Sequence, residues 1–304
     1  MIRAHMRRDK LRRARRIRQV IISSLIGLAI IGVLFAVTLG RDIPVLDTKG
    51  LIADQQRDLI FITFVLGMFV VIPVFVMLFA IAWKYRAGNK RAKYEPEVDG
   101  NAKLEALWWG IPILIIIVLA VITAVSTHAL DPYKKLDSNV KPVKIQVVSL
   151  NWKWLFIYPD QEIATVNYLN IPKDTPIDLE LTSDAPMNSF WVPALAGQVY
   201  SMAGMTTQLH IMADTPGTFN GTSANISGDG YADMNFKVNA LNETDFKTWA
   251  AWKYNSNAIP LLTESSYAEL AKPSHKNPEK TYLLSDTNLY NKVVMKYMSP
   301  GSSK

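Results

Sequence analysis

The chain contains 304 residues, of which 49% are hydrophobic and only 19% are charged, and it has no cysteine. The length predicts about two domains, and a mean hydropathy of +0.10 is high for a wholly soluble protein. Without cysteine the chain forms no disulfide, binds no iron–sulfur cluster or Cys-ligated zinc, has no catalytic thiolate and carries no lipid on a cysteine.

The formal net charge of +7 is unevenly distributed along the chain. Residues 1–128 carry 18 Lys/Arg and 9 Asp/Glu, whereas residues 129–304 carry 15 and 17. Nine of the basic residues lie between Arg3 and Arg18, opposed only by Asp9. Nucleic acid would need such charges together on a folded face. We therefore predict no nucleic-acid partner and interpret the excess as a signal of membrane topology.

Three stretches contain no formally charged residue: 19–40, 59–83 and 106–130. A helix needs about 20 mainly apolar residues to cross the hydrocarbon core of a bilayer. We therefore predict transmembrane helices at 59–83 and 106–130, flanked by the aromatic residues that are typical of membrane interfaces. The alternative is two buried helices of a soluble core, and their uncharged length disfavours it.

The basic residues around these stretches predict their orientation. Nine Lys/Arg precede the first stretch, three lie in 41–58 together with four Asp, and six lie in the loop 84–105. The positive-inside rule places the tail 1–18 and the loop 84–105 in the cytoplasm, and everything after residue 130 on the outer side. The stretch 19–40 is longer than the apolar region of a signal peptide, which favours a retained anchor. A cleaved signal segment and a mitochondrial transit peptide are the alternatives.

From residue 141 the sequence changes to alternating polar and apolar residues. Four short runs of this kind, separated by turn-forming segments, are typical of strands. We predict an antiparallel sandwich or barrel over 141–240. Helical spacing returns near 246–253 and 286–298, so 241–304 is predicted as a C-terminal helical extension. The four alternating runs are 143–147, 177–182, 208–211 and 235–238.

Common catalytic and metal-binding motifs are absent from the sequence. The four histidines, His5, His128, His210 and His275, show no i, i+4 pairing, and there is no glycine-rich phosphate loop. His210 falls on the polar phase of its predicted strand, so we expect it to be exposed. His128 lies near the outer end of a predicted span, where we expect an interfacial structural role. These patterns alone predict a membrane-anchored outer β-domain.

Five segments resemble subunit II of the haem–copper terminal oxidases, in the same order and spacing over most of the chain. The resemblance implies a membrane α-helical hairpin (plus an N-terminal helix) followed by an all-β cupredoxin-like Greek-key domain. It also implies a bacterial inner-membrane location with the large C-terminal domain in the periplasm. The segments are WKYR (83–86), KLEALWWGIP (103–112), NWKWLFIYP (151–159), MNSFWVP (187–193) and MAGM (202–205).

The positions that match the family's binuclear copper site have lost its ligands. In cytochrome c oxidases this site is built from two cysteines, two histidines, a glutamate and a methionine, and only the methionine is kept here. A bridged copper pair needs soft thiolates, which serine hydroxyls cannot replace. We therefore expect a vestigial site without metal, filled by polar packing of Ser223 and Tyr231. The six positions are Asn188, Ser223, Asn225, Ser227, Tyr231 and Met234.

Loss of these ligands within a preserved frame is typical of the quinol-oxidising branch, and several segments resemble the bo-type ubiquinol oxidases. The resemblance implies a structural subunit of a proton-pumping complex, in which ubiquinol passes electrons to oxygen through haems and one copper in subunit I. It implies subunits I, III and IV and membrane lipid as partners, no cytochrome c, and no cofactor in this chain. The alternatives are a menaquinol-using oxidase subunit and a free-standing cupredoxin-like interaction protein.

The resemblance also singles out individual residues. Glu105 is the only acidic residue close to the cytoplasmic start of the span 106–130, and the matching residue of the family lies at the mouth of a proton pathway. A carboxylate paired with a neighbouring lysine or a lipid head group is the alternative. Trp152 matches an electron-entry tryptophan that has no such task without copper, so we predict that Trp152 and Trp154 contact subunit I. Arg41 replaces a cysteine that is acylated in many relatives, which excludes that lipid anchor.

Overall fold

The computed structural model describes residues 43–86, 88, 89, 100–252 and 259–298, together with isolated positions between 18 and 36. The chain divides into two compact units, Met1–Ile43 and Pro44–Lys304, and all elements described below belong to the second. Outside the described residues lie His5, the predicted tail up to residue 17, most of the stretch 19–40, Arg41 and half of the predicted loop 84–105.

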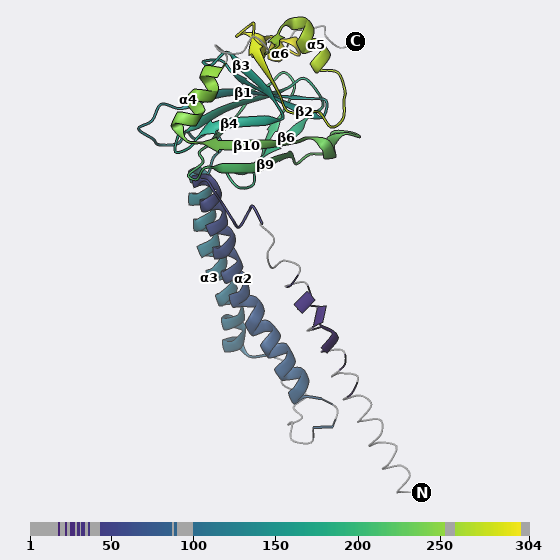
Figure 1. The fold of residues 1–304 in the computed structure, drawn as a ribbon. Helices are drawn as coiled ribbons and strands as arrows, with labels where there is room; N and C mark the ends of the chain where they lie inside the picture. The colour runs from purple at the N-terminus through teal and green to yellow at the C-terminus, as the bar shows by residue number, and fades with distance from the viewer. Residues whose placement is uncertain are drawn as a thin grey trace. The chain divides into compact units, whose positions relative to one another are not determined.

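Two long apolar helices begin the second unit (Figure 1): α2, Leu51–Lys84, and α3, Ala102–Ala129. Both are long and apolar enough to cross a membrane, and they contain almost all of the two predicted spans. Helix α2 starts before its uncharged stretch, and its first turn contacts the outer domain. Only Ala53 of the two helices is buried within the chain, so their apolar surface needs lipid or other helices to cover it.

The outer domain is a sandwich of two sheets. One sheet has the order β11-β12-β3-β2-β1-β5-β8 and the other has the order β4-β10-β9-β6-β7. The four predicted strands are present as β1, β5, β8 and β10, but the sheets are mixed rather than wholly antiparallel. Strand β1 runs parallel to β5 because the chain crosses to the other sheet at β4 before it returns. The strands are β1 Val143–Leu150, β2 Lys153–Tyr158, β3 Ile163–Val166, β4 Tyr168–Pro172, β5 Ile177–Ser183, β6 Asn188–Trp191, β7 Val199–Ser201, β8 Thr207–Ile211, β9 Gly217–Ser223, β10 Asn235–Leu241, β11 Leu261–Leu262 and β12 Lys280–Leu284.

The inner faces of the two sheets enclose an aromatic core. The ring centroid of Trp154 lies 5.4 Å from that of Phe190 and 5.7 Å from that of Phe236, both in edge-on arrangements. Phe190 and Phe236 stack at 5.0 Å, and such pairs add to the stability gained from burial alone. All six residues of β2 are buried, which explains why this strand shows no polar–apolar alternation.

The second face of the seven-stranded sheet is partly covered by the C-terminal segment. Leu155 and Ile157 of β2 pack there with Tyr267, Leu289 and Val293. The predicted C-terminal helices are present, but the segment also adds β11 and β12 to the sheet beyond β3. These strands have two and five residues, too few for alternation to reveal them. The helices are α4 Glu243–Ala251, α5 Glu264–Leu270 and α6 Leu289–Lys296.

The outer end of α2 joins the sandwich through main-chain contacts. The Ala53 amide donates to the Leu195 carbonyl at 3.2 Å, and an isolated bridge pairs Gly50 with Ala213. A Cβ atom at Gly50 would lie 2.6 Å from the Met212 carbonyl oxygen, so only glycine allows this close approach. The first turn of the membrane helix is therefore part of the outer domain.

Candidate functional site

The fold brings three of the vestigial copper positions into direct contact. Asn188 begins β6, Ser223 ends β9, and Met234 immediately precedes β10. The Ser223 hydroxyl donates to Asn188 Oδ1 at 3.1 Å, and the Ser223 amide donates to the Met234 carbonyl at 3.2 Å. Asn188, Ser223 and Met234 are at most 5% exposed. The strands thus bring these positions together, as a metal site would need, although the ligand side chains are replaced.

Hydrogen bonds within the chain satisfy most of the replacement side chains. The Asn188 amide donates to the Pro186 carbonyl and the Asn225 amide donates to the Met187 carbonyl, both at 2.8 Å. The Ser223 hydroxyl, which bonds Asn188, supplies the predicted polar packing. These bonds hold β6 and the loop after β9 together without a metal.

The other two positions, Ser227 and Tyr231, lie in the loop between β9 and β10. The Ser227 Oγ atom is buried without a hydrogen-bond partner among the described residues. Tyr231 is half-buried and begins the 3₁₀ turn η1, Tyr231–Asp233, and its hydroxyl makes no hydrogen bond within the described structure. The prediction that Tyr231 fills the site by polar packing therefore has no hydrogen bond to support it.

The donor set at this site does not fit a copper centre. The chain has no cysteine, and among the described residues no three His, Asp or Glu side chains come together in a way that could hold a metal ion. Copper pairs of this kind are stabilised by thiolate sulfur, whereas amide and hydroxyl groups suit harder ions. No electron-transfer step through copper can be assigned to this chain.

Trp152 packs against the loop between β9 and β10. Its φ of 63° lies in the left-handed region, which costs a residue other than glycine about 1–2 kcal/mol. The indole Nε1 donates to the Ser227 carbonyl at 3.4 Å, and its ring centroid lies 4.6 Å from that of His275. A Cβ atom at Gly230 would lie 2.4 Å from the indole, so the ring occupies space that only glycine leaves open.

The structure corrects the prediction that Trp154 contacts another subunit. This side chain is 0% exposed and lies in the centre of the aromatic core. A side chain without exposed surface cannot reach a partner, so only Trp152 of the two remains a candidate contact. The error arose because Trp152 precedes β2, whereas Trp154 lies on the face of β2 that points into the sandwich.

A buried carboxylate ties the C-terminal helix to the chain just before Asn188. The Asp184 side chain is 1% exposed. Lys296 Nζ and the Tyr297 hydroxyl each lie 2.6 Å from its Oδ1 atom, and the Tyr267 hydroxyl donates to Oδ2 at 2.8 Å. Burial and then the Asp184 charge raise the pKa of Tyr267. Desolvation lowers the pKa of Lys296, but the hydrogen bond and charge of Asp184 outweigh it and raise that pKa.

Glu105 lies in the first turn of α3 and is exposed. Asn101 caps this helix, because its side-chain oxygen accepts from the amides of Lys103 and Leu104 at 3.0 and 3.2 Å. A Cβ atom at Gly100 would lie 3.3 Å from Glu105 Oε1, so the carboxylate turns back toward the helix start, where the helix dipole favours negative charge. Glu105 and Lys103 form no ion pair within the described structure.

His210 is buried, which contradicts the prediction that it is exposed. It is 5% exposed, and its Nδ1 atom lies 2.8 Å from Asp178 Oδ1. The linker after α3 covers this face, since Asp131 and His210 line the same cavity. Alternation identifies the two faces of a strand but not a distant segment that lies over one of them. His128 is exposed at the end of α3, and its Nδ1 atom contacts the carbonyl one turn earlier.

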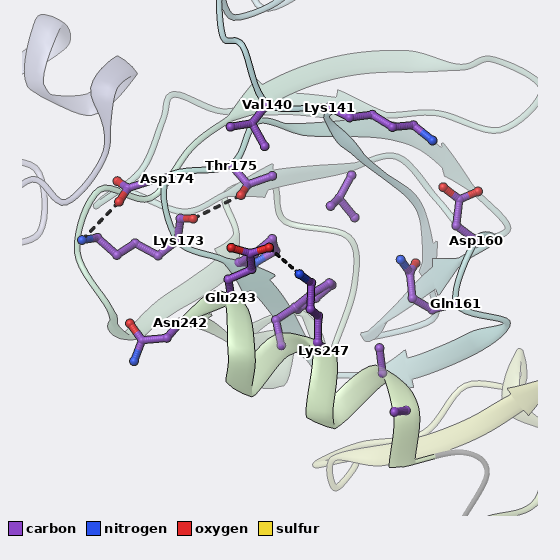
Figure 2. Close-up of a pocket in the computed structure, with 15 residues that line it drawn as sticks. Val140, Lys141, Asp160, Gln161, Lys173, Asp174, Thr175, Asn242, Glu243 and Lys247 are labelled. Atoms are coloured by element: carbon purple, nitrogen blue, oxygen red, sulfur yellow. Dashed lines mark hydrogen bonds and ion pairs between the residues drawn. The ribbon is translucent and has the colours of Figure 1, made fainter.

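An open groove of about 900 Å³ lies beside α4 (Figure 2). Glu243 and Lys247, one turn apart on α4, pair at 2.5 Å along one wall of the groove, and Lys173 and Asp174 pair at 3.2 Å near its other end. These four charged groups neutralise one another, and none of the residues predicted from sequence lines the groove. We assign no chemistry to it.

Comparison with known families covers the chain in three successive parts. Residues 47–124 match the family described as cytochrome c oxidase subunit II, transmembrane domain. Residues 159–241 match cytochrome c oxidase subunit II, periplasmic domain, and residues 260–301 match the COX aromatic rich motif. The third match coincides with the C-terminal segment that covers the seven-stranded sheet.

Several known proteins are similar over most of their length. The chain is 50% identical over 258 residues to cytochrome bo(3) ubiquinol oxidase subunit 2 of Pseudomonas putida, covering 85% of this chain and 82% of the relative. It is 45% identical to ubiquinol oxidase subunit 2 of Acetobacter aceti (85% and 84% covered) and 42% identical to quinol oxidase subunit 2 of Bacillus subtilis (83% and 78% covered). The periplasmic domain of subunit II of cytochrome oxidase from Bradyrhizobium japonicum aligns with a TM-score of 0.37 and 17% identity, covering 40% of this chain and 98% of that domain.

A membrane hairpin that carries a cupredoxin-like sandwich, with the frame of a copper site but none of its thiolates, defines a copper-free subunit II of the oxidase type. The chain belongs to the subunit II family of the haem–copper oxidases, in the branch of the ubiquinol oxidase subunit 2 proteins. The predicted family and fold class are therefore confirmed. The protein is an inner-membrane protein with its sandwich on the periplasmic side.

Proposed function

We propose that this chain is the structural, copper-free subunit II of a proton-pumping ubiquinol oxidase of an aerobic respiratory chain. The complex takes electrons from quinol in the bilayer and reduces oxygen to water in subunit I. The donor set carries the proposal: asparagine, serine and tyrosine replace five copper ligands in a chain that is 50% identical to a ubiquinol oxidase subunit 2. A sandwich without copper has no group that accepts electrons from a soluble cytochrome.

The comparisons favour ubiquinol over another quinol. Identity is 50% and 45% to two relatives named for ubiquinol, and 42% to the Bacillus subtilis relative that is named only for quinol. The quinol site belongs to subunit I in this proposal, together with the haems and the single copper that reduce oxygen. Menaquinol is the substrate that a direct assay has to exclude.

The proposed partners are subunits I, III and IV and membrane lipid. The membrane helices support this proposal, because α3 has no residue that is buried within the chain. A helix that is apolar on all sides is covered either by other helices or by lipid. On the periplasmic side we propose Trp152 as a contact with subunit I, since it is partly exposed and held in a strained backbone conformation.

We further propose that Glu105 is the entry point of a proton pathway on the cytoplasmic side. Its carboxylate is exposed and forms no ion pair with Lys103 within the described structure, so water reaches it. In the intact complex, Glu105→Ala should slow proton uptake and oxygen consumption about a hundredfold, the lower end of the usual contribution of a positioned proton-transfer group. Asp58→Asn, at the opposite end of the hairpin, is the matched control. Normal turnover of the Glu105 variant in an assembled complex would contradict the proposal.

Co-purification distinguishes an oxidase subunit from a free-standing cupredoxin-like interaction protein. The full chain, affinity-tagged and extracted from native membranes in mild detergent, should retain a haem-bearing membrane protein in a fixed ratio. The preparation should also oxidise ubiquinol with uptake of oxygen. Recovery of the chain without haem and without quinol oxidation would contradict the proposal.

A further inference from the structure

A strip of polar side chains crosses the seven-stranded sheet at its β8 edge, on the face that points away from the sandwich core. The strand register places Lys144, Asp178 and His210 in one row across β1, β5 and β8. The neighbouring row is Gln146, Glu180 and Gln208. Sandwich packing does not require these groups, because the residues between the two rows fill the core.

His210 is the buried end of this strip. His210 is 5% exposed, whereas the side chains of Asp178 and Lys144 are 22% and 47% exposed, so the row runs from the interior to solvent. The His210 Nδ1 atom bonds Asp178 Oδ1 at 2.8 Å. Its Nε2 atom, on the opposite edge of the ring, is buried and has no hydrogen-bond partner among the described residues. Buried polar atoms are almost always paired, so Nε2 points to a partner such as water.

Two cavities meet at His210. The first, of about 90 Å³, is lined by Gln56 of α2 and Asp131 after α3, where the membrane helices join the sandwich. It has room for about three water molecules of roughly 30 Å³ each. The second, of about 170 Å³, is lined by Asp178 and Lys135. His210 lines both cavities and Asp178 only the second, so the imidazole–carboxylate pair separates them. The charged groups around the pair are Asp131, Lys134, Lys135, Lys144 and Glu180.

We propose that His210 and Asp178 form a proton-exit relay from the membrane end of the sandwich to the periplasmic water. A proton from water in the first cavity binds Nε2, and the proton on Nδ1 passes to the Asp178 carboxylate and then to water in the second cavity. One bond to hydrogen breaks as another forms at each step, and no electron moves. Proton exchange through the cavity water, which takes the proton from Nε2 as another is delivered to Nδ1, restores the starting tautomer. Histidine suits this task because each of its two ring nitrogens can bind a proton.

This inference rests on the proposed function, which supplies the protons. Oxidation of a quinol to a quinone releases two protons with its two electrons, and a proton pump delivers further protons to the same side of the membrane. Both kinds of proton need a route past the periplasmic surface of the complex. The structure offers a titratable pair between a cavity at the membrane end and solvent.

The test uses the whole complex in liposomes, with the sandwich facing outward and a pH-indicating dye in the outer medium. After a ubiquinol pulse, His210→Gln and Asp178→Asn should each slow outward proton release about a hundredfold. The double variant should be no slower than either single one, because both act in one path. If oxygen uptake slows by the same factor as proton release, the relay carries the protons of quinol oxidation. If oxygen uptake is unchanged and only the number of protons released per electron falls, the relay carries pumped protons.

The matched control is His275→Gln, which removes the histidine of another histidine–carboxylate pair. His275 lies 3.6 Å from Asp233 and lines neither cavity. Proton release at the wild-type rate in both relay variants, or an equal loss in the control, would overturn the relay. Haem content and subunit ratio show whether each variant complex assembles. If the variant of the buried His210 does not assemble, the variant of the partly exposed Asp178 provides the test of the relay. A wild-type complex that does not oxidise quinol would instead overturn the proposed function.

Discussion

The two faces of the seven-stranded sheet differ in the side chains that they carry and in the segments that cover them. The inner face is mainly apolar and closes on the second sheet with aromatic side chains such as Trp154. The outer face is divided: the C-terminal segment covers its apolar half over β2 and β3, and the linker after α3 covers its polar half over β5 and β8. The contacts around Asp184 and His210 lie outside the core between the two sheets.

The largest change in stability is expected on the inner face, at Trp154. The Trp154→Ala substitution removes a completely buried indole that packs on Phe190 and Phe236. Loss of such a side chain lowers the free energy of unfolding by about 3–5 kcal/mol. Urea unfolding of the detergent-solubilised full chain, followed by circular dichroism, measures this change.

The neighbouring Trp152 provides the matched control. In Trp152→Gly the lost ring contacts are offset by release of the left-handed strain, which is about 1–2 kcal/mol. The unfolding free energy of this variant should therefore stay much closer to that of the unmodified chain. Equal losses at the two tryptophans would contradict the distinction between core and surface loop.

A smaller effect is expected where the C-terminal segment is attached to the sandwich. Asp184→Asn replaces the charged acceptor of Lys296, Tyr297 and Tyr267, and hydrogen bonds to charged groups contribute about 1.5–3 kcal/mol. The free energy of unfolding should fall by about 2–3 kcal/mol, with earlier protease cleavage of the C-terminal segment. The exposed pair of Asp286 and Lys292 offers the control, since Asp286→Asn should leave the unfolding midpoint unchanged. Similar losses in both variants would show that burial of Asp184 has no special role.

The smallest effect concerns alkaline pH. Burial raises the pKa of Tyr158, Tyr168, Tyr267 and Tyr290 above the ordinary value of 10.0. Above that pH the folded chain keeps protons that the unfolded chain loses, so stability is complete below pH 10.0 and falls as the pH rises further. Tyr158→Phe should flatten this fall, at a cost near neutral pH of about 2 kcal/mol, because the hydroxyl donates to the Asn170 carbonyl and accepts from the Asn170 amide. An unchanged slope in unfolding midpoint against pH would contradict this assignment.

Features with a clear period or a fixed spacing could be predicted from the sequence. The uncharged stretches predicted α2 and α3, alternation predicted β1, β5, β8 and β10, and motif spacing located the vestigial copper positions. The missed strand β2 is buried on both faces, so its run Lys-Trp-Leu-Phe-Ile-Tyr has no period of two. The strands β11 and β12 are too short to carry a pattern.

The side chains that were predicted wrongly depend on segments far away in the sequence. His210 lies on a polar phase, but the linker after α3 buries it and Asp178 supplies its partner from another strand. Trp152 and Trp154 lie in the same motif, and the same contact was predicted for both. Trp152 precedes β2, whereas Trp154 lies on the face of β2 that points into the core. Asp184 gave no local signal, because its three partners come from the C-terminal segment. Local pattern identifies elements, whereas burial depends on which elements cover each other.

The central claim is that this oxidase takes its electrons from a quinol because its subunit II has no copper centre. Oxygen uptake by the purified complex, with ubiquinol and then reduced cytochrome c as electron donor, tests it directly. Rapid uptake with ubiquinol and none with cytochrome c is the predicted result. Rapid oxidation of cytochrome c, together with the purple mixed-valence spectrum of a binuclear copper centre, would contradict the account.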